Sequence, residues 1–257
     1  MDLKIAGRVA LVGASTGGLG LASARALAAE GCQVVISGRR AHLAVQLAGE
    51  MDGALAVPAD FREPGAADAL VDATMAGLGP VDILVLNGPG PAPGSAADLE
   101  PADLDAAFAT LVEHQVRLVR RTLPGMRERG WGRIVSIASS GVRTPLPNLA
   151  ASNAGRAALT SYLKTLAGEV AGEGVTINTV LPGRISTDRV RDLDRANAER
   201  RGVPVDEVRS AAQASIPAGR YGSPDEFGAV VAFLAGSGAS YVTGATICCD
   251  GGLIPSL

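Results

Sequence analysis

Aromatic residues and cysteine are both scarce in this chain. Only 3% of the residues are aromatic, so an aliphatic pocket is expected rather than a stacking platform for a flat substrate. The three cysteines, Cys32, Cys248 and Cys249, form no even set, and adjacent residues of a strand point to opposite faces. We therefore expect reduced, buried cysteines that act as small apolar residues, and no disulfide framework.

The sequence also lacks long apolar runs and any excess of charge. No window approaches the roughly 18 apolar residues that a membrane span needs, and the segment 1–8 has no apolar core of a signal peptide. The formal net charge is −3 with no basic stripe, which disfavours nucleic acid and membrane as partners. We expect a cytoplasmic protein that acts on a small-molecule substrate, with no metal site.

Short apolar runs alternate with longer Ala/Leu-rich stretches along the 257 residues. This alternation predicts βαβ units, and strands so uniformly apolar are typical of a parallel sheet covered by helices on both faces. Helices are expected at 19–30, 104–129 and 154–171. The expected strands are 9–12, 34–36, 55–57, 83–86, 134–137, 176–180 and 246–248. The prediction is a single-domain α/β Rossmann fold spanning 1–257, a doubly wound parallel sheet of about seven strands.

The segment 184–217 differs from the rest because it is dense in Arg, Asp and Glu and interrupts the strand pattern. Such an insertion is expected to form a lid over a substrate site. A pair of solvated surface helices is the alternative. The arginines of this segment could receive a carboxylate or phosphate.

A glycine-rich loop follows the first expected strand and opens directly into a helix. Small residues there let the backbone approach a pyrophosphate, whose charge the free N–H groups and the positive end of the helix favour. The expected cofactor-binding residues of this loop are Ala14, Thr16, Gly18, Leu19 and Gly20.

The end of the second expected strand indicates which dinucleotide is bound. An acidic residue at that position would bind the ribose diol of NAD, but Arg39 and Arg40 stand there. A guanidinium suits the 2′-phosphate of NADP instead. We therefore predict NADP(H) as the cofactor, with Arg39 as its phosphate contact.

These motifs resemble the short-chain dehydrogenase/reductase family over nearly the whole chain. The segments that carry the resemblance are 10–20, Asp60 with Phe61, Leu86-Asn87-Gly88-Pro89, Asn178 to Gly183 with Thr187, 220–226, 241–244 and 250–252. The resemblance implies a Rossmann fold, an oligomer (homotetramer or dimer) and further cofactor-binding residues. These are Asp60, Phe61, Asn87, Gly88, Arg156, Pro182, Gly183, Ile185 and Thr187.

The catalytic residues that the resemblance implies are altered. The family uses Asn, Ser and a Tyr-x-x-x-Lys box, in which Tyr transfers the proton, Lys lowers its pKa and Ser orients the carbonyl. Here Ser139 matches the serine, whereas Ser152 and Arg156 replace the tyrosine and lysine, and Leu111 replaces the asparagine. Residues i and i+4 share a helix face, so Ser152 and Arg156 can still point at one site. Arg156 remains charged but does not shuttle a proton.

Other residues could supply the missing acid. His114 and Tyr221 are candidates by chemistry, although burial is the expected role of His114, and Tyr221 belongs to the C-terminal motif. Tyr162 is expected in the core or at an interface.

The favoured function is an NADP(H)-dependent oxidoreductase with catalytic residues Ser139, Ser152 and Arg156, acting on a small carbonyl, alcohol or related unsaturated substrate. One alternative is a cofactor-binding sensor or scaffold without redox turnover. Another is a redox-free lyase that resembles the halohydrin dehalogenases, which use Ser, Tyr and Arg.

Overall fold

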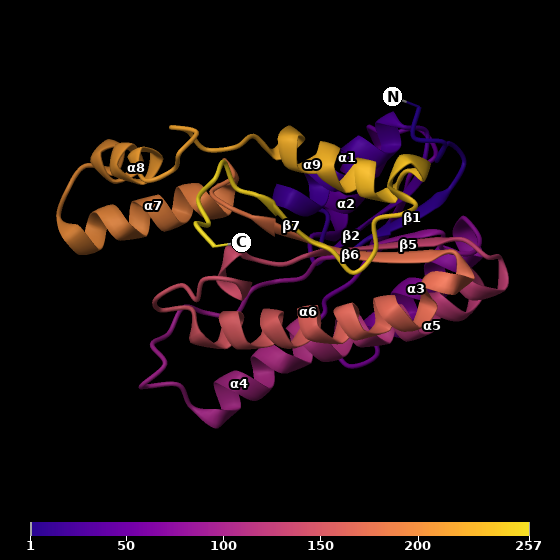
Figure 1. The fold of residues 1–257 in the computed structure, drawn as a ribbon, viewed down its shortest axis with the longest axis horizontal. Helices are drawn as coiled ribbons and strands as arrows, with labels where there is room; N and C mark the ends of the chain where they lie inside the picture. Colours follow the sequence, from indigo (N-terminus) through magenta and orange to yellow (C-terminus); the bar gives the residue numbers. More distant parts are fainter. Residues whose placement is uncertain (1, 257) are drawn as a thin grey trace.

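The computed structural model describes residues 2–256, and within them a parallel seven-stranded sheet forms the centre of the molecule (Figure 1). Its strands lie in the order β3-β2-β1-β4-β5-β6-β7, so the direction of winding reverses between β1 and β4. The strands are β1 (Val9–Val12), β2 (Gln33–Gly38), β3 (Leu55–Pro58), β4 (Ile83–Leu86), β5 (Gly132–Ile137), β6 (Val175–Pro182) and β7 (Thr246–Cys249). The predicted doubly wound single-domain Rossmann fold is confirmed.

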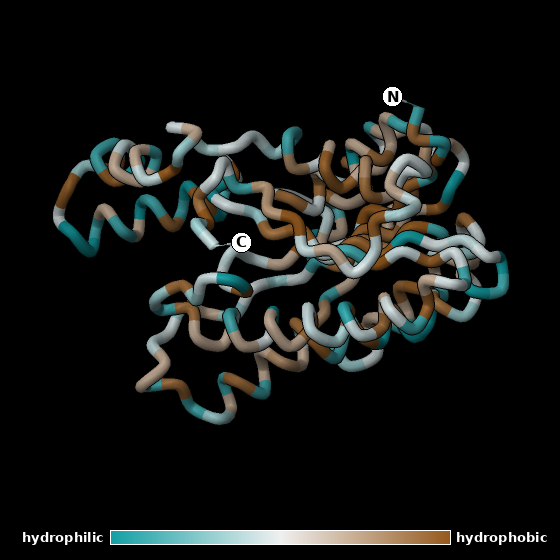
Figure 2. Tube along the Cα trace, viewed as in Figure 1, coloured by the Kyte–Doolittle hydropathy of each residue, from teal (hydrophilic) through white to brown (hydrophobic). Residues whose placement is uncertain are grey.

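Helices cover both faces of the sheet. The larger ones are α1 (Gly18–Ala29), α2 (Ala41–Gly49), α3 (Ala66–Gly77), α5 (His114–Glu128), α6 (Ala150–Val170) and α9 (Pro224–Ala235). One apolar core lies between the sheet and α1, α2 and α9, and a second lies between the sheet and α3, α5 and α6. Figure 2 shows the hydrophobic residues concentrated along the sheet and on the helix faces that meet it. This double cover explains why the inner strands β1 and β4 consist entirely of apolar residues.

The predicted helix at 104–129 is interrupted. It consists of α4 (Pro101–Phe108), a π-helical turn at Ala109–Glu113, and α5. Leu111 lies in this turn and is buried against Gly155 of α6, where an added Cβ would be 3.0 Å from Leu111 Cδ1. The π turn therefore brings Leu111 beside the helical turn that carries Ser152 and Arg156.

Two helices, α7 (Asp188–Arg201) and α8 (Val205–Ala214), stand beyond the edge of the sheet (Figure 1). They form the greater part of the charged 184–217 segment, and most of their surface is polar (Figure 2). Thr187 caps α7 by accepting a hydrogen bond from the Val190 N–H at 3.4 Å. The start of α7 is thereby fixed directly after β6.

The cysteines depart from expectation in part. Cys32 is buried, and its burial raises the pKa of the thiol to about 12, whereas Cys248 and Cys249 are only half-buried. All three are free thiols. The terminal strand β7 lies at the edge of the sheet, which leaves its two cysteines less covered than the prediction required.

Within residues 2–256, no helix combines the length and apolar character needed to cross a bilayer.

Candidate active site

The glycine-rich loop lies at the carboxyl end of β1, beside the point where the sheet reverses its winding. In open α/β sheets this is the position at which ligands bind. Helix α1 begins there at Gly18 with no side-chain cap and no acidic residue in its first turn. Its first N–H groups and its positive end therefore face the loop, as an anion site requires.

Gly20 is the glycine of this loop that close packing most clearly requires. A Cβ at this position would lie 2.6 Å from the Ala14 carbonyl oxygen and 2.7 Å from Asn87 Nδ2. Asn87, directly after β4, donates from Nδ2 to the carbonyl oxygens of Gly13 (3.0 Å) and Ala14 (3.2 Å). In this structure the Asn87 amide thus holds the loop in position rather than facing a ligand.

Arg40, which was not among the predicted site residues, lies over the loop. Its Nη2 donates to the Thr16 carbonyl oxygen at 2.6 Å, and a Cβ added at Gly17 would be 3.1 Å from the same nitrogen. The predicted Arg39 is exposed, and its positive charge helps to lower the pKa of Asp60. The sequence pointed to a guanidinium after β2 but could not tell which of two neighbouring arginines turns toward the loop.

Asp60 and Phe61 lie at the end of β3 and have different environments. The Asp60 carboxylate accepts hydrogen bonds from Arg62, which are the main cause of its lowered pKa. The Phe61 ring is buried and stacks on His114 with the ring centroids 5.8 Å apart. Only the backbone of Phe61 is therefore placed to meet a ligand.

The segment after β6 approaches the glycine loop from the other side. A Cβ at Gly18 would lie 3.9 Å from Thr187 Cγ2, and one at Gly183 would lie 2.6 Å from Asp250 Cα. Ile185 is buried and forms an isolated bridge with Gly222. The structure thus brings the predicted residues Gly18 and Thr187 together, although they are far apart in the chain.

Ser152 and Arg156 come together on α6, beside the backbone at the end of β5 that leads into Ser139. Arg156 donates from Nε to Ser152 Oγ at 3.3 Å, and from Nη1 to the carbonyl oxygens of Ile137 (3.1 Å) and Ala138 (3.2 Å). Ser139, the next residue, accepts a hydrogen bond from the Gly141 N–H at 3.1 Å. Both serine hydroxyls accept an N–H, which leaves their protons available to a further acceptor.

Arg156 remains a cation in this setting. Burial, and then the neighbouring charge of Arg189, lower its pKa to about 10. The guanidinium is therefore protonated at neutral pH, and it can stabilise negative charge that develops on a bound oxygen.

Arg156 also lines a small cavity of about 10 Å³ between the sheet and α5 and α6. This volume matches about one water molecule. Two buried polar atoms on its wall, Ser136 Oγ and Gln115 Oε1, have no hydrogen-bond partner within residues 2–256. The other lining residues are Leu86, Asn87, Gly88, Leu111, Ile137, Ala138 and Leu159.

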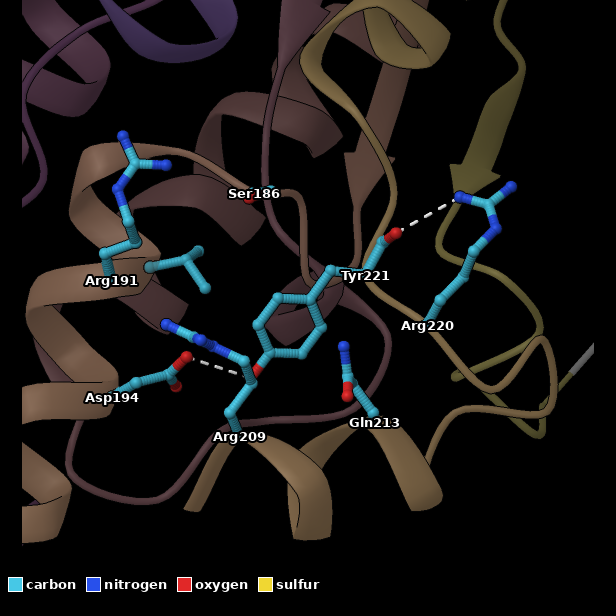
Figure 3. Close-up of a pocket in the computed structure, with 8 residues that line it drawn as sticks. Ser186, Arg191, Asp194, Arg209, Gln213, Arg220 and Tyr221 are labelled. Atoms are coloured by element: carbon cyan, nitrogen blue, oxygen red, sulfur yellow. Dashed lines mark hydrogen bonds between the residues drawn. The ribbon is translucent and has the colours of Figure 1, made fainter. Parts of the chain in front are cut away.

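The three candidate replacement acids, His114, Tyr162 and Tyr221, form no hydrogen bond with Ser152 or Arg156 in the described part of the chain. Burial lowers the pKa of His114, which stacks on Phe61, and it raises the pKa of Tyr162, which packs against the second core. Tyr221 faces a separate cavity of about 380 Å³ formed with α7 and α8, where its hydroxyl donates to Asp194 at 3.0 Å (Figure 3). No group of three or more potential metal ligands occurs within the described residues 2–256.

Comparison with known proteins agrees with this arrangement. Residues 13–254 match the family model described as enoyl-(acyl carrier protein) reductase. A nodulation protein G of Azospirillum brasilense is 35% identical over 254 residues, which cover 96% of this chain and 98% of that protein. The chain belongs to the short-chain dehydrogenase/reductase family.

Two further members of this family connect it to oxidoreductase chemistry. D-beta-hydroxybutyrate dehydrogenase of Cupriavidus necator is 31% identical over 253 residues, covering 96% of this chain and 98% of that protein. L-sorbose reductase of Gluconobacter frateurii, solved with NADPH and L-sorbose, superposes with a TM-score of 0.94 at 30% identity, and the match covers 100% of both chains.

Proposed function

We propose that the protein is an NADP(H)-dependent oxidoreductase that acts on a small carbonyl, alcohol or related unsaturated substrate. The observation that carries the proposal is the uncapped start of α1 with the Arg40 guanidinium directly over its loop. Together these features provide N–H groups for a pyrophosphate and a cation for a 2′-phosphate. The NADPH in the similar L-sorbose reductase structure supports the same assignment.

The proposed cofactor-binding residues surround the carboxyl ends of β1, β2, β3, β4 and β6. When bound, NADP(H) supplies or accepts the hydride. Arg39 and Arg40 would hold the 2′-phosphate, Asp60 the adenine amino group, and Arg156 the ribose. The remaining residues that we assign to this site are Ala14, Thr16, Gly18, Leu19, Gly20, Phe61, Asn87, Gly88, Pro182, Gly183, Ile185 and Thr187.

The proposed catalytic group is Ser139, Ser152 and Arg156. The two serine hydroxyls would donate hydrogen bonds to the substrate oxygen, because each already accepts an N–H. Arg156 would stabilise negative charge on that oxygen. No tyrosine lies at this position, and an aliphatic hydroxyl is a weaker acid than a phenol. We therefore propose that water donates the proton that neutralises the substrate oxygen.

We also propose roles for the charged 184–217 segment and for the surface formed by the C-terminal motif. The segment 184–217 would act as a lid on the substrate side of the site. The assembly would be a homotetramer or dimer, which the family resemblance of the 241–252 segment supports together with the fully exposed ring of Tyr241. The mass of the protein in solution tests the assembly.

The cofactor proposal is tested by fluorescence titration of NADPH and NADH against the wild type and the Arg39→Ala, Arg40→Ala and Arg25→Ala variants. A hydrogen bond to a charged group contributes about 1.5–3 kcal/mol, so Arg40→Ala should weaken NADPH binding by about 10- to 100-fold and NADH binding much less. Arg25 is an exposed residue of α1 paired with Glu50, and it serves as the matched charge control. If neither nucleotide binds the wild type, the proposal is wrong.

A further inference from the structure

The arginines of the 184–217 segment differ in their partners. Most of them bind an acidic or amide side chain in the same region. These pairs are Arg184 with Asp194, Arg191 with Asp188, Arg195 with Asp192, Arg200 with Asn197, Arg201 with Glu207, and Arg209 with Asp206. Within residues 2–256, the Arg189 guanidinium forms neither a hydrogen bond nor an ion pair, and its charge is not balanced locally.

Arg189 extends from the first turn of α7 toward the loop that follows β4. A Cβ added at Gly90 would lie 3.0 Å from Arg189 Nη2 and 3.4 Å from its Cζ, so the guanidinium stands against this glycine. Gly90 comes two residues after Gly88, which lines the small cavity together with Arg156. Arg189 thus reaches the candidate active site from the lid side.

Arg156 is the second unbalanced cation of this region. Its described partners are two backbone carbonyl oxygens and the Ser152 hydroxyl, all of them neutral. The charge of Arg189 is close enough to contribute to lowering the pKa of Arg156, after the larger effect of burial. An anion bound between the two guanidiniums would offset both the repulsion between their charges and the free-energy cost of burying the Arg156 charge.

We propose that the substrate carries a carboxylate, which binds between Arg156 and Arg189 beside the Ser139 and Ser152 hydroxyls. This inference rests on the proposed function, because it assigns the ligand as the substrate of that site. The Arg189 guanidinium can bind a planar carboxylate through two parallel hydrogen bonds, whereas Arg156 already uses Nε and Nη1 and can add a hydrogen bond from Nη2. Arg189 is then the residue by which the lid recognises the substrate.

The test is calorimetric titration of the full-length protein, with and without NADPH, using butyrate, butyramide and inorganic phosphate as probes. The variants are Arg189→Gln and Arg189→Lys, with Arg191→Gln as the control. Arg191 lies two residues along the same helix, but Asp188 already binds it. Because Arg189 is exposed, both of its variants are expected to fold, and their melting temperatures verify this.

We expect Arg189→Gln to weaken butyrate binding at least tenfold, Arg189→Lys to restore part of the loss, and Arg191→Gln to change it less than twofold. Butyramide should bind at least tenfold more weakly than butyrate. Equal binding of butyrate and butyramide, an unaffected Arg189→Gln variant, or tighter binding of phosphate would each overturn the proposal. If butyrate binding depends on Arg189 but NADPH does not bind, the carboxylate site stands and the proposed redox function fails. If NADPH binds but butyrate binding does not depend on Arg189, the carboxylate site is wrong and the proposed redox function stands.

Discussion

At the scale of single residues, Arg156 determines how the proposed catalytic group is held together. Arg156 bridges Ser152 and the end of β5 through hydrogen bonds from two of its nitrogens. A lysine ammonium is a single point on a flexible stem and cannot span these acceptors in the same way. Arg156 is therefore an integral part of the local structure, because it fixes Ser152 and the carbonyl groups beside Ser139.

Arg156→Lys should consequently lower kcat/KM by about 10- to 100-fold, since it removes charge-assisted hydrogen bonds at the reacting centre. Arg121→Lys is the matched control, because Arg121 is partly exposed on α5 and pairs with Asp68 and Asp72. Steady-state NADPH oxidation measures both variants. An Arg156→Lys variant that is as active as the wild type would contradict the role assigned to the arginine.

The pH profile provides a second test at this scale. The pKa of Arg156 is about 10, and that of His114 lies below its ordinary value, so Arg156 stays charged and His114 stays neutral from about pH 7 to 9. The kcat/KM of the wild type should therefore be flat over this range and fall only as the pH approaches 10 and Arg156 loses its proton. A bell-shaped profile centred near neutrality would show that another acid takes part.

The residues that sequence could and could not predict differ in how they depend on three-dimensional packing. The glycine loop, Ser139, Ser152 and Arg156 are recognisable from local motifs, and the structure brings the last two into direct contact. Arg40 was missed because two adjacent arginines look alike until the loop is folded. Arg189 could not be separated from its neighbours either, since only the structure shows which arginines of the 184–217 segment have side-chain partners.

At the scale of elements, the sheet was predictable because its strands are short and mostly apolar, and the inner strands β1, β4 and β5 are fully buried, whereas the edge strands β3 and β7 are half-buried. The seven expected strands lie within two residues of the observed ends. The break between α4 and α5 was not predictable, because the π turn at Ala109–Glu113 is associated with packing of Leu111 against Gly155, which is distant in the chain. Such π turns often occur at functional sites.

The junction of β1 and α1 is the element on which the cofactor proposal depends. Gly20→Ala would place a Cβ 2.6 Å from a backbone oxygen, which cannot move as a flexible side chain could. We expect at least a tenfold loss of NADPH affinity and a lower melting temperature. Gly49→Ala in α2 is the control, since its added Cβ meets nothing within 4 Å. Equal NADPH affinity in the Gly20→Ala variant and the wild type would argue against the assigned phosphate loop.

At the scale of the whole molecule, the proposed cofactor site connects segments from most of the chain. The loop after β1, the end of β2, Asn87 and Thr187 all converge there, and α9 packs closely on α1, where a Cβ at Gly228 would lie 2.6 Å from the Ala22 carbonyl oxygen. A ligand that binds all these segments only in the folded state stabilises the entire fold.

NADPH at 100 times its Kd should therefore add about 2.7 kcal/mol to the free energy of unfolding. For a chain of this size that corresponds to a rise of roughly 5–10 °C in Tm. NADH at the same concentration should raise Tm less, because it lacks the 2′-phosphate. Thermal denaturation followed by circular dichroism measures the difference. Equal shifts for the two nucleotides would contradict a role of Arg39 and Arg40 in selecting NADPH.

The most direct test of the proposed oxidoreductase function is hydride transfer itself. The protein would be incubated with NADPH deuterated at the transferable position and a panel of ketones, aldehydes and enones, each as a carboxylic acid and its methyl ester, and the products analysed by mass spectrometry. We expect deuterium on carbon in at least one product, and a loss of about 100-fold or more in the rate of formation of that product in the Ser139→Ala variant. Tight binding of NADPH without label in any product would contradict it and favour a cofactor-binding protein without redox turnover.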